Sequence, residues 1–172
     1  MAVSVSQLWR NEKYLPWSYL GVAAVLGIAS GIFWATIVQL PTFTLNEHLQ
    51  AVPYPERELA NWFSIDFWFA VIGIALGLLL GTLSWFWFQD QGWLVVVMAL
   101  AAVLFSAVLC LQVGTLISPG SFELRVTQAQ VGDKIPISFE LRSWSTFFLW
   151  CLSAITPVMV LSFISRKKRI KT

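Results

Sequence analysis

Residues 65–88 read IDFWFAVIGIALGLLLGTLSWFWF, and after the polar break QDQG at 89–92, residues 93–117 read WLVVVMALAAVLFSAVLCLQVGTLI. An α-helix needs about 20 apolar residues to cross a hydrocarbon core about 30 Å thick, and both runs meet this length. The short break has a length that joins antiparallel helices. The two runs therefore predict a transmembrane helical hairpin.

Two further apolar runs lie outside this hairpin, at residues 17–39 and 143–164. The 172-residue chain is 58% hydrophobic and only 12% charged, whereas soluble domains average about 25% charged residues. An ordinary soluble domain is thereby excluded. We expect an all-α integral membrane fold in a single domain, 1–172, with spans at about 17–39, 65–88, 93–117 and 143–164, outer loops at 40–64 and 118–142, and a basic tail at 165–172.

The orientation follows from the basic residues. Five of the eleven Lys and Arg residues lie at the end of the chain, as Arg166, Lys167, Lys168, Arg169 and Lys171. Because cytoplasmic segments carry the excess of Lys and Arg, and an even number of spans puts both ends on one side, we expect both termini in the cytoplasm and the chain in the plasma membrane. Topology alone accounts for the tail, which would also attract anionic lipid headgroups. No basic fold surrounds it, so nucleic acid is not expected as a partner.

Glycines recur every four residues in two spans. Gly27 and Gly31 lie in the first span, and Gly73, Gly77 and Gly81 lie in the second. Such strips let helix backbones approach closely inside a bilayer. One interpretation is that the two strips pack on each other within the chain. The other is that they mediate docking to another membrane protein or to a second copy.

The second outer loop alternates apolar and polar residues at 122–127 and 135–142, with Gly132-Asp133 between the two arms. This pattern predicts a small extracytoplasmic β-hairpin over about 121–142. An isolated two-stranded hairpin is marginal in water, so its apolar face must rest on the membrane surface, the first loop or another protein.

Three acidic or imidazole side chains are candidate polar sites. Asp66 opens the second span, where we expect it to cap the first helical turn at the outer interface; a proton or cation role is the alternative. Glu47 and His48 carry possible zinc-ligating atoms, but loop residues of this kind more often form a solvated acidic face, so no metal site is assigned. No catalytic or cofactor-binding spacing is present, and we expect neither an enzyme nor a cofactor.

Several short motifs are shared with a known group of proteins. They are Gly31 to Trp34 with Pro41, Asp66 and Phe69 leading into Gly73, Gly77, Gly81 and Trp85, then Val131-Gly132-Asp133, and Leu141-Arg142-Ser143 running into Leu149-Trp150. On these residues the chain resembles an uncharacterised family of four-span membrane proteins of actinobacteria. The resemblance implies four spans in a plasma membrane and implies no activity.

These patterns predict contact surfaces rather than chemistry. We expect a non-enzymatic accessory or scaffold subunit of a cell-envelope complex, whose partners are the lipid bilayer and another membrane protein or a second copy. The alternative is a small oligomeric transporter or lipid-handling protein.

Overall fold

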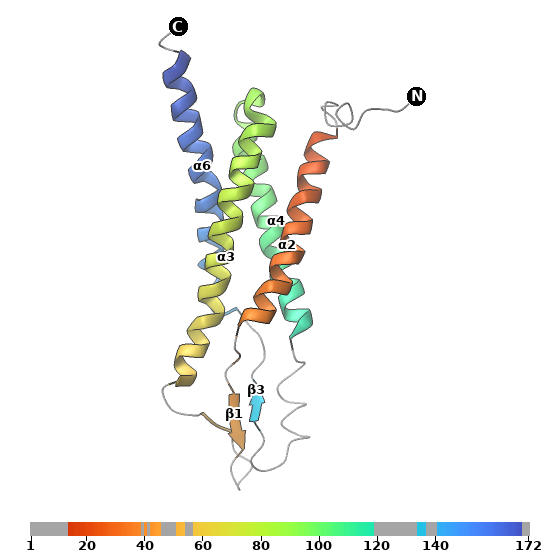
Figure 1. Cartoon of the computed structure of the whole chain (residues 1–172), viewed down its shortest axis with the longest axis vertical. Helices are drawn as coiled ribbons and strands as arrows, with labels where there is room; N and C mark the ends of the chain where they lie inside the picture. Colours follow the sequence, from red (N-terminus) through yellow and green to blue (C-terminus); the bar gives the residue numbers. More distant parts are fainter. Residues whose placement is uncertain are drawn as a thin grey trace, which may run out of the picture.

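The computed structural model describes residues 14–38, 40, 42–45, 51–53, 57–118, 134–136 and 141–169. Four long helices dominate this part of the chain: α2 (Leu15–Ile37), α3 (Arg57–Phe88), α4 (Leu94–Ile117) and α6 (Thr146–Arg169) (Figure 1). Each contains a segment long and apolar enough to cross a membrane, namely Leu15–Ile37, Phe63–Gln91, Leu94–Ile117 and Thr146–Ser165. The four predicted spans are therefore present, and the chain is a multi-pass membrane protein.

The bundle is built from two parallel helix pairs. α2 packs mainly on α4, and α3 packs mainly on α6, whereas α2 and α3 share few contacts. Chain direction reverses at each connection, so the two members of each pair run the same way. α3 also contacts α4, which joins the two pairs, and α2 and α6 lie on opposite sides of the bundle (Figure 1). The closest partner of each helix is thus not its neighbour in sequence.

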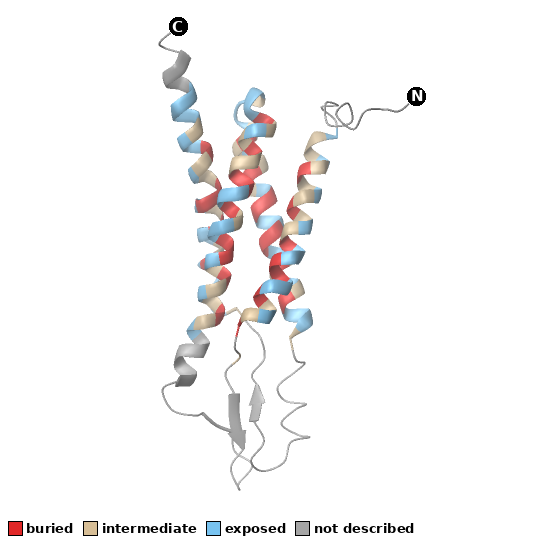
Figure 2. Cartoon of the chain, in the orientation of Figure 1, coloured by how far each residue is buried: buried red, intermediate tan, exposed pale blue. Residues whose placement is uncertain are grey.

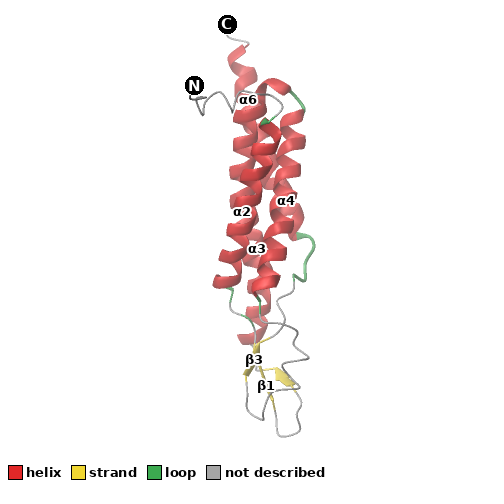
Figure 3. Cartoon of the chain, turned by 90° about the vertical axis from the view of Figure 1, so that its right-hand side faces the viewer, coloured by secondary structure: helices red, strands yellow, loops and turns green. Residues whose placement is uncertain are grey.

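The connections divide between the two ends of the bundle (Figures 1 and 3). The start of α2, the end of α6 and the turn between α3 and α4 share one end. This turn is a 3-10 helix, η1 (Gln89–Gln91), followed by Gly92 at φ 64°, a left-handed conformation that glycine adopts without steric cost. The strands lie at the opposite end. We call the end with the turn between α3 and α4 the tail end, and the end with the strands the strand end.

The predicted β-hairpin at 121–142 is wrong. The strands described are β1 (Thr42–Leu45), β2 (Ala51–Pro53) and β3 (Lys134–Pro136), in the order β2-β1-β3. β1 pairs antiparallel with both neighbours, so β3 pairs with a strand of the loop between α2 and α3, which the predicted hairpin did not include. The proposed arm at 122–127 lies outside the described residues. Alternation indicates an extended segment but does not specify its partner.

The core is a column of buried side chains along the bundle axis (Figure 2). Its largest fully buried members are Trp34 of α2, Phe69 of α3 and Trp150 of α6, together with Tyr19 near the tail end. The outward faces carry large exposed apolar side chains, as expected of helices that face lipid.

Candidate functional site

The glycine strip of α3 is covered by α6. A Cβ added at Gly73 would overlap the Trp150 indole, and one at Gly77 would lie 2.8 Å from the Trp150 carbonyl oxygen. At Gly81 it would lie 2.7 Å from Cγ of Pro157. Because glycine has no side chain, α6 can occupy the space beside this strip. Small residues bring membrane helices together in this way.

The glycine strip of α2 is covered by α4 in the same manner. A Cβ at Gly27 would lie 2.8 Å from the Ser106 carbonyl oxygen, and one at Gly31 would lie 2.8 Å from that of Cys110. Both strips are thus used within the chain, but the prediction that they pack on each other is wrong. Docking to a partner through them is also contradicted, because both are occupied by the chain's own helices.

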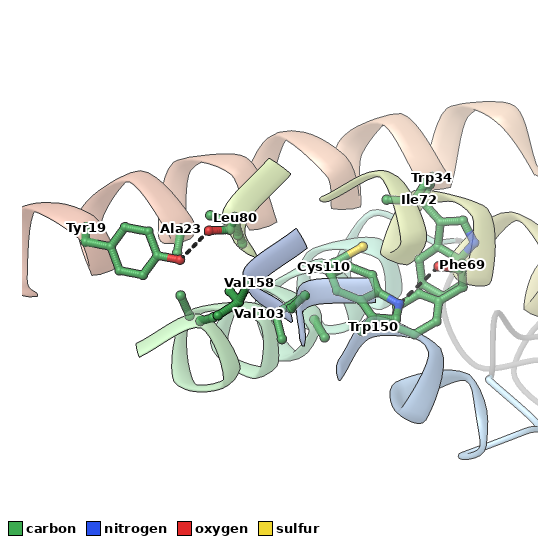
Figure 4. Close-up of a cluster of buried hydrophobic side chains, with 14 of the residues drawn as sticks. Tyr19, Ala23, Trp34, Phe69, Ile72, Leu80, Val103, Cys110, Trp150 and Val158 are labelled. Atoms are coloured by element: carbon green, nitrogen blue, oxygen red, sulfur yellow. Dashed lines mark hydrogen bonds between the residues drawn. The ribbon is translucent and has the colours of Figure 1, made fainter. Parts of the chain in front are cut away.

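One face of α3 accepts hydrogen bonds from two other helices. Trp34 Nε1 donates to the Ile65 carbonyl oxygen at 3.1 Å. Trp150 Nε1 donates to the Phe69 carbonyl oxygen at 3.1 Å (Figure 4). Ser153 Oγ donates to the Gly73 carbonyl oxygen at 3.2 Å. The three acceptors are four residues apart, so they follow one face of the helix. Each indole or hydroxyl group finds a partner that the hydrocarbon could not provide.

Three hydroxyl groups make further hydrogen bonds between helices. Tyr19 Oη donates to the Leu80 carbonyl oxygen at 2.8 Å, which joins α2 to α3 (Figure 4). Ser84 Oγ donates to the Val95 carbonyl oxygen at 2.7 Å, which joins α3 to α4. Ser106 Oγ donates to the Ala23 carbonyl oxygen, which joins α4 to α2. The sequence analysis assigned no role to these hydroxyl groups. The signal that could have found them is a hydroxyl side chain within an apolar span, which can bond to a neighbouring helix.

An aromatic cluster, formed by Trp34, Phe69, Phe147 and Trp150, reinforces these bonds toward the strand end. The Phe69 ring centroid lies 5.0 Å from that of Trp34, 5.0 Å from that of Trp150 and 5.5 Å from that of Phe147. The rings are tilted against one another, a geometry that aromatic quadrupoles favour. Trp34 and Trp150 are both fully buried, so both indoles pack between helices.

Asp66 does not cap the first turn of its helix. α3 begins at Arg57, so Asp66 lies more than two turns inside it, and the predicted cap is wrong. Its Oδ1 instead accepts a hydrogen bond from the backbone N–H of Arg142 at 3.2 Å. This bond holds the segment that leads into α6 against α3. It restrains the carboxylate at the strand end of the bundle.

Glu47, His48 and Lys171 lie outside the described residues, while the backbone of Arg166–Arg169 forms the last turn of α6. Among the described residues, no group of three or more His, Cys, Asp and Glu residues is placed to hold a metal ion. The site that the structure does define is the set of interhelical contacts.

A scan against protein-family models, a search of the curated proteins and a search of the solved structures each found no match to this chain. The resemblance to an actinobacterial four-span family therefore stays a prediction. Function has to be inferred from the contacts of the chain itself.

Proposed function

We propose that this chain is a non-enzymatic accessory or scaffold subunit of a membrane complex in the cell envelope. In this proposal it resides in the plasma membrane with both termini in the cytoplasm. The observation that carries the proposal is the set of six side-chain hydrogen bonds that fasten each helix to backbone carbonyl groups of another.

Such a bundle is suited to holding a fixed shape. Interhelical hydrogen bonds in membranes contribute about 0.6 kcal/mol each on average, so six contribute on the order of 4 kcal/mol. The covered glycine strips and the aromatic cluster add close packing to these bonds. A transporter needs elements with two alternative arrangements, whereas these contacts all favour one.

Outward apolar faces of the described helices remain for a partner, among them one on α2 and one on α6. Val25 on α2 and Leu152 on α6 are each 67% exposed, and the two helices lie on opposite sides of the bundle (Figure 1). A partner membrane protein, or a second copy, can cover one face while lipid covers the other. This arrangement replaces the glycine strips as the expected docking surface.

Site-specific photo-crosslinking in intact cells tests the proposal. A photoreactive residue is placed at Val25 or at Leu152, with the fully buried Ala99 as the control that meets only this chain. We expect one outward position to give a protein adduct of a single mass, which mass spectrometry assigns to a partner or to a second copy. Lipid adducts alone at both positions would contradict the scaffold role.

The orientation is tested separately. A reporter that is active only outside the cytoplasm is fused after Thr172, at the end of the basic tail. The proposal expects an inactive fusion, because the Lys and Arg excess favours the cytoplasmic side. An active fusion would reverse the assignment of both ends.

A small oligomeric transporter or lipid-handling protein is the second candidate. It is favoured by one observation: the tail-end part of α6, beyond Val158, has no buried residue among its described side chains. Asp66 would be its polar residue at the opposite end. Reconstituted vesicles that exchange a fluorescent phospholipid faster with the protein, and lose this gain in Asp66→Asn, would favour this candidate over the scaffold.

A further inference from the structure

Gln112 is a polar side chain on the outward surface of α4. It is exposed, and it lies five residues before Ile117, where the apolar span ends. At 1.5 Å per residue this places it about 8 Å inside that end of the span. Cβ atoms in a helix tilt toward the helix N-terminus, which for α4 lies at the tail end. The Cα–Cβ bond of Gln112 is therefore directed toward the middle of the span and away from the nearer aqueous surface.

The carboxamide of Gln112 has no hydrogen-bond partner among the residues that the structure describes. Three exposed threonines differ in this respect, because each hydroxyl donates to a carbonyl oxygen of its own helix; they are Thr36, Thr115 and Thr156. A carboxamide cannot be satisfied in this way, because its oxygen needs a donor and the N–H groups inside a helix are already bonded. Hydrocarbon offers no donor either. At this depth the group therefore requires a polar partner from another molecule.

Gln112 also belongs to a seam of exposed residues with heptad spacing. The seam follows α4 in steps of four, three and four residues, through Ala101, Phe105, Val108 and Gln112. Such spacing is typical of a helix face that packs on a parallel helix with a left-handed crossing. Gln112 stands at an a position of this heptad, where a single polar residue specifies the register and the number of chains.

We propose that α4 pairs with α4 of a second copy of this chain through the seam, and that the two Gln112 carboxamides donate to each other across the interface. Two copies inserted in the same direction carry parallel α4 helices, so a two-fold axis along the bilayer normal brings identical residues together. A carboxamide carries both an acceptor and donors, so it is complementary to its own copy. This self-complementarity identifies a second copy as the occupant. The seam is separate from the faces of α2 and α6 considered above, so the dimer does not depend on the scaffold proposal.

Energy transfer between two fluorescently labelled pools of the full chain measures the dimer dissociation constant in vesicles that are diluted stepwise with lipid. Gln112→Leu removes two reciprocal interhelical hydrogen bonds, so we expect this constant to rise by about tenfold. Gln112→Asn keeps the carboxamide and should retain most of the affinity. The control is Thr156→Val, which removes an exposed hydroxyl that bonds only within α6 and should leave the constant unchanged.

Disulfide cross-linking in intact membranes locates the interface. Cys110 and Cys151 are first changed to alanine, and a single cysteine is then placed at Val108 or at Ile28. These two positions are 43% and 42% exposed, and they lie at a similar depth because α2 and α4 pack against each other at this level. We expect a covalent dimer of this chain from Val108→Cys and none from Ile28→Cys. The yield from Val108→Cys should fall when Gln112→Leu is added.

Four outcomes would overturn the proposal. A chain that stays monomeric at every dilution, or a dissociation constant unchanged in Gln112→Leu, would show that the carboxamide does not hold two copies together. Equal dimer yields from Val108→Cys and Ile28→Cys would indicate random collision. An adduct of another mass from Val108→Cys would assign the seam to a different membrane protein. The scaffold role is tested at Val25 and Leu152, so failure of the dimer leaves that proposal standing.

Discussion

Substitution of Gly73 by alanine tests whether the contact between α3 and α6 holds the bundle together. The added Cβ would overlap the Trp150 indole, so the ring must move. It then loses its 3.1 Å hydrogen bond to the Phe69 carbonyl oxygen and its 5.0 Å ring contact with Phe69. Such a bond contributes about 0.6 to 1.7 kcal/mol in membranes, and such a ring pair about 0.5 to 1.5 kcal/mol. We therefore expect Gly73→Ala to have a free energy of unfolding about 1 to 3 kcal/mol lower than that of Gly21→Ala, which shares its gain in helix propensity.

The matched control is Gly21→Ala on α2. A Cβ at Gly21 meets no atom within 4 Å, so this variant carries the same gain in helix propensity without the clash. Both are measured by reversible unfolding in mixed detergent micelles, with helical circular dichroism as the signal. If Gly73→Ala proves as stable as Gly21→Ala, the close approach of α6 to this strip does not contribute to stability and the reasoning fails.

Three further changes probe separate contacts. Ser106→Ala removes the hydrogen bond from α4 to α2 and should lower the free energy of unfolding by about 0.6 to 1.7 kcal/mol in the same assay. The control is Thr115→Ala, whose exposed hydroxyl bonds only within α4, and it should change stability by less than about 0.5 kcal/mol. Equal effects of the two variants would contradict an interhelical role for Ser106. Asp66→Asn keeps an oxygen that can accept the backbone bond, so hydrogen exchange of the amide leading into α6 should quicken in Asp66→Ala but not in Asp66→Asn. The half-buried Cys151 should react with an apolar thiol reagent in the folded protein, and the buried Cys110 only after unfolding; early reaction of Cys110 would indicate an opened pair of α2 and α4.

The positions of the spans could be predicted because crossing a bilayer imposes a length and a composition on each helix. The residues that start α3 show where this signal ends. α3 begins at Arg57 rather than at the predicted residue 65. Hydropathy missed this start because residues 57–62 are helical but too polar to belong to the apolar span. Hydropathy reports which part of a helix lies in hydrocarbon, not where its hydrogen bonding begins.

Partner choice could not be predicted from the same residues. The spacing of Gly73, Gly77 and Gly81 indicates a flat helix face, but any helix can approach such a face. Only the structure shows that Trp150 and Ser153 lie against it. The two long loops pose the same difficulty, since alternation predicted a strand from residue 135 onward, whereas the partner of β3 comes from the other loop. Local patterns specify conformations, and long-range geometry specifies pairs.

The pairing of helices that are distant in sequence has a consequence for biosynthesis. When the first two spans have entered the bilayer, the strips at Gly27 and Gly73 have no cover, since α4 and α6 are still to be made. The early hairpin of α2 and α3 has few backbone contacts of its own, although the side chains of Tyr19 and Trp34 already link the two helices. Final assembly must therefore wait until the last span is released by the insertion machinery. A chain that stopped before α6 would leave the glycine strip of α3 uncovered. Such an exposed strip would distinguish an incomplete chain from the folded protein for membrane proteases and chaperones.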